Sequence, residues 1–289
     1  MNKAKFVLML SCALLTGCAF KTNTPTIPTV YLHLTDTVPI EYKNFPPEPM
    51  MLNLFHSKYY KGDSFCHFNK DDLDLYKSSL RLVTFYKISN YTVLSLAPSH
   101  PVTIGDYHTE IINMNSCETL RFDNTNASVS KSEKYISLCE EDRVKILSVD
   151  RNLKPINIKS IPCDEAYLSS NDKWLIVEYK KYIKIYDFND MKLVFEYYIK
   201  KRSYHTPAIF DDFMRLYETP ALVVFDDNLQ KIIISDKNIN LSYINKLDMN
   251  KKEMFYYTNT KDPKTKKYIR RYYYSKFNTS TNKQENTNE

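Results

Sequence analysis

The chain has 289 residues, of which 43% are hydrophobic, and its formal net charge is +6. This length suits one large domain or two small ones, and so mild a charge gives no reason to expect a nucleic-acid partner. Only three residues are glycine, Gly17, Gly62 and Gly105. The chain therefore lacks the glycines that a GxGxxG dinucleotide loop, a Walker A loop or a G-x-S-x-G nucleophile elbow requires. No cofactor is expected, and we expect Asn and Asp at turn positions with positive φ.

Residues 1–17 have the pattern of a secretory leader. Lys3 and Lys5 precede an apolar run from Phe6 to Leu15, which is shorter than the about 20 residues that a membrane span needs. Together with the segment Leu-Thr-Gly-Cys that ends at Cys18, this pattern resembles the signal peptide and lipobox of a bacterial lipoprotein. The resemblance implies cleavage before Cys18, a diacylglyceryl group on its thiol and a further acyl chain on its amine, which together anchor the protein firmly in a bilayer. An ordinary secretory signal is the alternative.

The segments at the two ends of the mature chain have compositions unlike the rest. Ala19 follows the cysteine. In Gram-negative lipoproteins Asp at this position is the common inner-membrane signal, so the resemblance implies an outer-membrane anchor facing the periplasm, with the cell surface as the alternative. Residues 18–44 are predicted to be the lipidated N-terminus and a Thr/Pro-rich tether. Residues 278–289 are wholly polar and are predicted to be a disordered tail, which leaves residues 45–277 as a single β domain.

Four further cysteines lie in that domain: Cys66, Cys117, Cys139 and Cys163. An even number in an oxidising compartment indicates up to two disulfides. Sequential pairing, Cys66–Cys117 and Cys139–Cys163, closes the shortest loops and is the expected arrangement; four buried thiols are the alternative. The chain has no Cys-x-x-Cys motif and no His-x-x-x-His spacing, so no metal site is expected.

The domain sequence consists mostly of short runs rich in Val, Ile, Tyr and Phe between polar turns, which predicts strands. Short helices are expected only at residues 71–80 and 207–217. A polar turn, a strand, a short turn and a second strand recur 39 positions apart, since Lys134 corresponds to Lys173 and Lys145 to Lys184. A period near 40 residues with four short strands is typical of a propeller blade.

Residues 130–190 thus resemble the blades of WD40/YVTN-like β-propellers, although the Gly-His and Trp-Asp signatures are absent. Fainter copies begin near Glu110 and Leu222. We therefore expect an all-β, propeller-like fold with about five or six blades of about 40 residues. The alternative is a β-sandwich.

Two pairs of carboxylates could take part in chemistry, Asp211–Asp212 and Asp226–Asp227. Some propeller enzymes hydrolyse glycans with paired carboxylates, and the distance between the two groups decides such a role. Both pairs fall where turn residues are expected. No catalytic residue is therefore assigned, and the protein is predicted not to be an enzyme.

The segment 261–277 is both basic and aromatic. On a strand, alternate side chains share a face, so one face would present Tyr268, Arg270, Tyr272 and Tyr274. Tyr and Arg are frequent hot spots of protein interfaces. We expect this face to bind a protein partner, with anionic lipid and glycan as alternative ligands. The structural interpretation is a hairpin turning at Asp262–Pro263 whose rings pack on one another.

These features predict a membrane-anchored periplasmic lipoprotein that acts as a non-enzymatic protein-binding module. Its partners would be the bilayer, through acylated Cys18, and a protein. An immunity-type protein that neutralises an antibacterial toxin is one form of this function. An envelope-assembly scaffold lipoprotein and a propeller-fold glycan or ester hydrolase are the alternatives.

Overall fold

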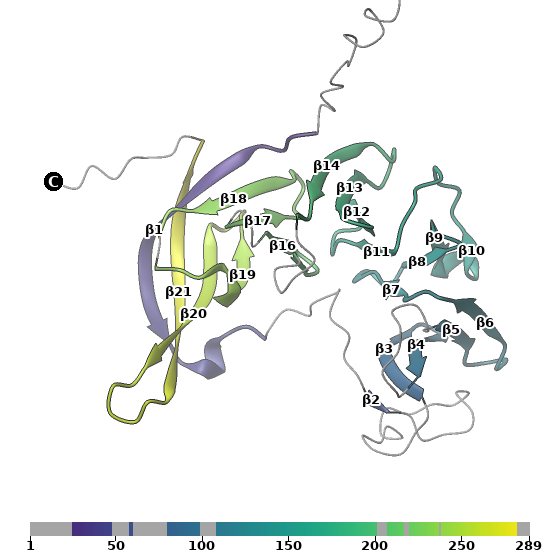
Figure 1. Ribbon diagram of the computed structural model, residues 1–289, viewed down its shortest axis with the longest axis horizontal. Helices are drawn as coiled ribbons and strands as arrows, with labels where there is room; N and C mark the ends of the chain where they lie inside the picture. The colour runs from purple at the N-terminus through teal and green to yellow at the C-terminus, as the bar shows by residue number, and fades with distance from the viewer. Residues whose placement is uncertain are drawn as a thin grey trace, which may run out of the picture.

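The computed structural model describes residues 25–47, 58–59, 80–98, 108–200, 207–216, 220–236 and 238–281. These residues form β-strands joined by turns and by three short 3-10 helices, η1 (Tyr42–Asn44), η3 (Val149–Arg151) and η4 (Leu241–Tyr243) (Figure 1). None of the helices in this part of the chain has the length and apolar character of a membrane span.

Apart from β1, the strands follow one another along the chain as five blades, each made of antiparallel strands. The first blade contains β2 (Lys58–Tyr59), β3 (Leu80–Ile88), β4 (Tyr91–Pro98), β5 (His108–Asn113) and β6 (Thr119–Asp123). The second contains β7 (Ser128–Val129), β8 (Tyr135–Glu140), β9 (Arg143–Ser148) and β10 (Lys154–Pro155). The third contains β11 (Glu165–Leu168), β12 (Trp174–Tyr179), β13 (Tyr182–Asp187) and β14 (Leu193–Tyr198).

The fourth and fifth blades share one eight-stranded sheet. The fourth contains β15 (Ala208–Ile209), β16 (Phe213–Leu216), β17 (Ala221–Val224) and β18 (Gln230–Ile234). The fifth contains β19 (Ile244–Asp248), β20 (Glu253–Lys261), β21 (Tyr268–Ser280) and β1 (Thr29–Ile40). β1 joins the two blades, because it pairs antiparallel with β21 and parallel with β18.

The repeat seen in the sequence corresponds to two successive blades. β8 and β9 form its first copy and β12 and β13 its second, each as an antiparallel hairpin. The predicted all-β, propeller-like fold is confirmed by these four-stranded sheets. The described residues contain five blades, which lies within the predicted range.

Apolar side chains fill the space between each blade and the next. Four clusters alternate with the five blades: Ile88 and Ile136 lie between the first and second, and Ile146 and Leu175 between the second and third. Larger clusters follow between the third and fourth blades and between the fourth and fifth. A strand of a central blade therefore buries both faces, which explains why runs such as residues 174–177 are continuously apolar.

β1 corrects the predicted domain boundaries. Residues 18–44 were expected to be a tether, but residues 29–40 form a strand of the fifth blade. Leu32 is fully buried in the core between the fourth and fifth blades, and Val30 and Leu34, two positions either side, pack against the same core. This period of two marks a strand, and the Thr and Pro residues before it obscured the pattern. At the other end β21 extends to Ser280, which pairs with Tyr31, so the tail does not begin at residue 278.

The helix expected at residues 207–217 is also wrong. This stretch contains β15 and β16, and Phe213 contacts the core on one side of the blade while Met214 and Leu216 contact the core on the other. Burial on both faces placed apolar residues at helical as well as strand spacing. The other expected helix, residues 71–80, lies outside the described residues except for Leu80, which begins β3.

The turns use few glycines, as expected, but the residues that replace glycine are more varied than expected. Thirteen described residues other than glycine have positive φ, and the four that are Asn or Asp are Asn124, Asp142, Asn152 and Asp172. The others include Leu153 and several Lys and Glu residues. Asp side chains mostly act elsewhere in the turns, where they accept a hydrogen bond from the peptide N–H two residues on, as Asp187 does from Asn189.

The disulfide expected between Cys139 and Cys163 is present, with 5.9 Å between the Cα atoms. Both cysteines are buried in the core between the second and third blades. Cys117 is disulfide-bonded too, whereas Cys66, its expected partner, lies outside the described residues.

Candidate protein-binding surface

The hairpin formed by β20 and β21 projects beyond the rest of the fifth blade (Figure 1). β19 pairs with β20 only as far as Tyr256, and β1 pairs with β21 only as far as Tyr272. The two long strands continue to pair with each other up to Lys261 and Tyr268. Residues 258–271, here called the hairpin tip, therefore form a two-stranded ribbon with no neighbouring strand among the described residues.

One side of this hairpin presents the residues that the sequence singled out. The register places Tyr257 opposite Tyr272 and Phe255 opposite Tyr274, so their side chains share a face. We call this the hairpin face. It consists of Phe255, Tyr257, Asn259, Lys261, Tyr268, Arg270, Tyr272 and Tyr274.

The aromatic rings near the base of the hairpin face hold one another in place. The ring centroid of Tyr272 lies 4.7 Å from that of Phe45, 5.2 Å from that of Tyr42 and 6.2 Å from that of Tyr257. Tyr257 also stacks on Tyr243 with a centroid distance of 4.8 Å. Such contacts restrict the rotamers of the rings, so less conformational entropy remains to be lost when a partner binds.

The outer part of the hairpin face is open to solvent. Tyr268 is 71% exposed and Tyr42, which borders the face, is 72% exposed. Arg270 is exposed as a residue, and its guanidinium carbon lies 4.1 Å from the centroid of the Tyr257 ring, a geometry that favours a cation–π interaction. An exposed Tyr, an Arg fixed over a ring and a rigid aromatic base form the kind of surface that protein interfaces use as anchors.

The hairpin tip concentrates positive charge. It contains six Lys or Arg residues and one acidic residue, Asp262, so its formal charge is +5, against +6 for the whole chain. None of the four tip lysines forms an ion pair with another described residue. The carboxylate of Asp262 accepts hydrogen bonds from the hydroxyl of Thr265 and from the backbone N–H of Lys264, which lower its pKa and shape the turn. The tip therefore presents cations to solvent on a defined turn.

The four predicted partner-binding residues do not lie in equal environments. Tyr268 and Arg270 are exposed, whereas Tyr272 and Tyr274 are partly buried. The hydroxyl of Tyr274 donates a hydrogen bond to Glu253 over 2.8 Å, and this bond raises the pKa of the phenol. Tyr272 and Tyr274 thus stabilise the surface from below, and Tyr268 and Arg270 are the members that a partner could reach.

Sequence reasoning missed Tyr42 and Phe45, because both were assigned to the region around the tether. The chain reverses at η1, directly after β1, and this turn lays Tyr42 and Phe45 against Tyr272. The side-chain amide of Asn245 donates to the backbone oxygens of Pro46 and Pro47 and holds the following segment on the blade. The alternation of apolar residues in the segment 30–34 could have shown that a strand of the domain comes directly before Tyr42 and Phe45.

The two carboxylate pairs lie on neighbouring turns at one edge of the fourth blade, where the N–H of Phe225 donates to the backbone oxygen of Asp212 over 2.8 Å. Asp212 accepts a hydrogen bond from Ser170 and lies 3.9 Å from Lys131. Asp226 accepts from the N–H of Asn228. Both pairs therefore occupy the turn positions expected of them.

The phenol of Tyr86, on the first blade, has a shifted pKa. Burial, with the charges of Asp211 and Glu165, raises the pKa of Tyr86 to about 12. Tyr86 belongs to β3 and Glu165 to β11, and Asp211 lies between β15 and β16. The hydroxyl of Tyr167 donates to Glu165 over 2.7 Å. This hydrogen bond joins two side chains of the same strand, β11.

Two further expectations concern lipid and metal. Cys18, the predicted lipidation site, lies outside the described residues. Within the part of the chain that the structure describes, no group of His, Cys, Asp and Glu side chains is arranged to hold a metal ion.

This chain is similar to solved structures, but not to known protein families or curated proteins. No protein family and no curated protein matches the chain. The β-propeller domain of the Trilobed protease from Pyrococcus furiosus is similar at 12% identity and a TM-score of 0.38, over 67% of this chain and 68% of that chain. BamB from Moraxella catarrhalis is similar at 7% identity and a TM-score of 0.35, over 83% of this chain and 97% of that chain.

Acylaminoacyl peptidase from Pyrococcus horikoshii is similar at 9% identity and a TM-score of 0.38, over 61% of this chain but 35% of its own. This chain thus spans about a third of the peptidase.

Proposed function

We propose that this protein is a lipid-anchored periplasmic lipoprotein that acts without catalysis, by binding an acidic protein partner through the hairpin face and the hairpin tip. The observation that supports the proposal is the hairpin itself. A two-stranded ribbon alone is at best marginally stable in water, yet here it extends well beyond its blade and bears most of the net charge of the chain.

The topology would direct this surface away from a membrane anchor. β1 begins beside the C-terminal end of β21, where Tyr31 pairs with Ser280, and ends beside Tyr272, near the tip. β21 has 13 residues, which at about 3.4 Å each span about 40 Å. An anchor at Cys18 would enter the domain at one end of this strand and the hairpin tip would lie at the other.

Charge and aromatic anchors would play different parts in binding. Six exposed cations attract an acidic surface over several Å and raise the association rate, an effect that salt screens. Tyr268 and Arg270 would then make the short-range contacts that slow dissociation. Binding is therefore expected to weaken as ionic strength rises, mainly through a slower association.

The test uses the full-length protein purified from the envelope of its own host, with partners identified by mass spectrometry. The double variant Tyr268→Ala/Arg270→Glu should lose the specific partner. The matched control is Tyr198→Ala/Lys200→Glu, which removes an exposed Tyr and reverses a charge on the third blade. Equal partner recovery by wild type and both double variants would refute the proposed surface.

The anchor has a separate test. Cys18→Ser should abolish labelling by a fatty-acid analogue and release the protein from the membrane or leave its leader uncleaved. Continued labelling would contradict the lipobox assignment. The identity of the captured partner then separates the roles: a secreted antibacterial toxin supports an immunity protein, and an envelope-assembly component supports a scaffold.

A further inference from the structure

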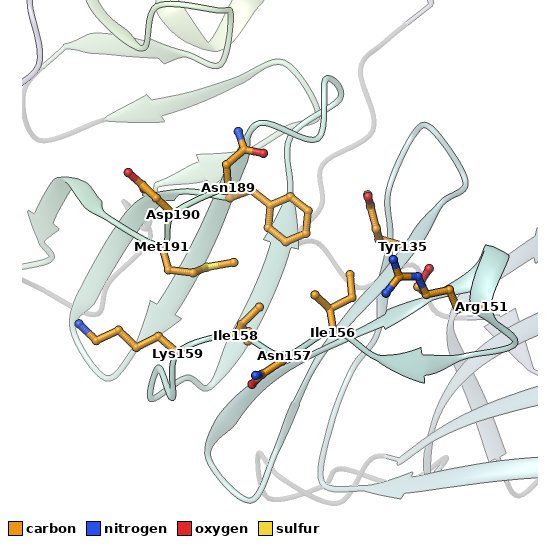
Figure 2. A pocket seen from close by; sticks show the side chains of 11 residues that line it. Tyr135, Arg151, Ile156, Asn157, Ile158, Lys159, Asn189, Asp190 and Met191 are labelled. Atoms are coloured by element: carbon orange, nitrogen blue, oxygen red, sulfur yellow. The ribbon is translucent and has the colours of Figure 1, made fainter.

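A cleft of about 490 Å³ opens between the second and third blades, far along the chain from the hairpin (Figure 2). One wall is the segment after β10, residues 156–159, and the other is the turn between β13 and β14, residues 188–191. Tyr135 and Phe188 meet across it with a centroid distance of 5.2 Å. The cleft thus lies where the second and third blades meet.

The first wall is a bulge in the edge of the second blade. The N–H of Ile156 donates to the oxygen of Ile146, and the N–H of Val144 donates to the oxygen of Ile161. Between these two bonds β9 runs over two residues, from Ile146 to Val144, whereas the outer segment runs over five, from Ile156 to Ile161. The outer segment therefore has three residues more than the strand beside it. Residues 157–160 are therefore displaced outward from the blade, and such bulges recur beside functional sites.

The bulge leaves hydrogen-bonding groups available at the cleft. The backbone N–H and C=O groups of residues 157–160 bond to no backbone group elsewhere in the described chain. Exposure alternates along this wall, with Ile156 and Ile158 partly buried and Asn157 and Lys159 exposed. This is the pattern of an extended segment that could pair with another strand.

The floor of the cleft is apolar. Ile156, Ile158, Phe188 and Met191 all pack against the core between the second and third blades, and all four remain partly exposed. They are brought together from two blades, so they form one patch rather than scattered surface residues. A partner side chain placed here would extend an existing hydrophobic core.

Cations flank this patch. Arg151 and Lys159 line the cleft, both are exposed, and the ion pairs of the described residues involve neither. The one acidic lining residue, Asp190, already accepts a hydrogen bond from the N–H of Lys192. Figure 2 shows these two cations on opposite sides of the cleft, so a carboxylate that enters on either side would meet one of them and be bound by charge-assisted hydrogen bonds.

We propose that this cleft binds an extended peptide segment of a partner protein, in which apolar residues alternate with other residues and an acidic residue flanks them. The peptide adds a strand along residues 157–160 and places an apolar side chain between Ile158 and Met191. Its carboxylate lies at Arg151, on one side of the cleft. This site is independent of the hairpin, and it gives the protein a second place to hold a partner.

The test is a selection of random heptapeptides, displayed on phage, with the intact mature protein as bait. We expect enriched peptides to share alternating apolar residues and a flanking Asp or Glu. The synthesised consensus peptide should bind with a Kd on the order of 10–100 μM. Methylating the peptide nitrogens that pair with residues 157–160 should weaken it at least tenfold.

Protein variants locate the site. Arg151→Glu and Ile158→Lys should each weaken binding of the consensus peptide tenfold or more, and Arg151 is exposed enough for its replacement to leave folding intact. Lys154→Glu reverses an exposed charge on the same blade outside the cleft and should have little effect.

Selection without enrichment, a consensus without an acidic residue, or affinity that neither Arg151→Glu nor Ile158→Lys lowers would overturn the proposal. The hairpin variant Tyr268→Ala/Arg270→Glu should bind the peptide like the wild type, so failure at one site is distinguishable from failure at the other.

Discussion

Replacing Leu32 by Ala should show whether β1 is part of the folded domain. Leu32 is fully buried, and its position pairs with Ile234 of β18 and Thr279 of β21. Truncation of a buried Leu removes its transfer free energy and leaves a cavity, which costs 2–5 kcal/mol depending on how far the site collapses. Because the core around Leu32 is formed by two blades that β1 itself joins, we expect a loss of about 3 kcal/mol in the free energy of unfolding.

The matched control is Val38→Ala on the same strand. Val38 is 49% exposed, so its truncation should cost about 0.5 kcal/mol or less. Denaturant unfolding can be followed by fluorescence of Trp174, the single tryptophan, which is buried between the third and fourth blades and donates to the backbone oxygen of Asp226. If Leu32→Ala costs no more than Val38→Ala, residues 29–40 are a tether after all and the five-blade description is wrong.

Two further predictions concern a turn and a partly buried phenol. Lys252 is exposed and has φ of 56°; Lys252→Gly should raise the free energy of unfolding by about 1 kcal/mol because glycine adopts this conformation without strain. Lys251→Gly, at a neighbour without positive φ, should lower it by about 0.5–1 kcal/mol, and equal denaturation midpoints for the two variants would contradict this account of the turn. Burial raises the pKa of Tyr86 to about 12, above the usual 10.0 of a tyrosine, so its neutral form contributes stability that is complete below pH 10 and is lost as pH rises to about 12. The alkaline loss of stability should be smaller in Tyr86→Phe than in the wild type, and an identical pH profile would show that Tyr86 does not titrate there.

The parts of the fold that the sequence predicted best are those with a local pattern. The repeat around Lys134 and Lys173 became two hairpins because each copy carries its own turn and alternation. The alternation in residues 268–274 likewise placed Tyr268 and Arg270 on one strand face. These patterns need no knowledge of distant contacts.

The parts that the sequence could not predict depend on contacts between distant segments. β1 joins β18 and β21, which lie some 200 residues further on, and nothing in residues 29–40 specifies those partners. Tyr42 and Phe45 join the hairpin face for the same reason. The bulge at residues 157–160 is visible only when β9 is seen beside it, and the helix predicted at residues 207–217 failed because burial on both faces removes the strand period.

The most direct test of the proposed binding surface is site-specific photo-crosslinking in living cells. A photoreactive phenylalanine analogue would replace Tyr268 in the hairpin tip and, as the control, Tyr198 on the third blade, which is 45% exposed. We predict a discrete crosslinked product from position 268, with the yield reduced by Arg270→Glu, and none from position 198. Equal products from both positions, or a product from position 198 alone, would contradict the claim that the hairpin is where this protein holds its partner.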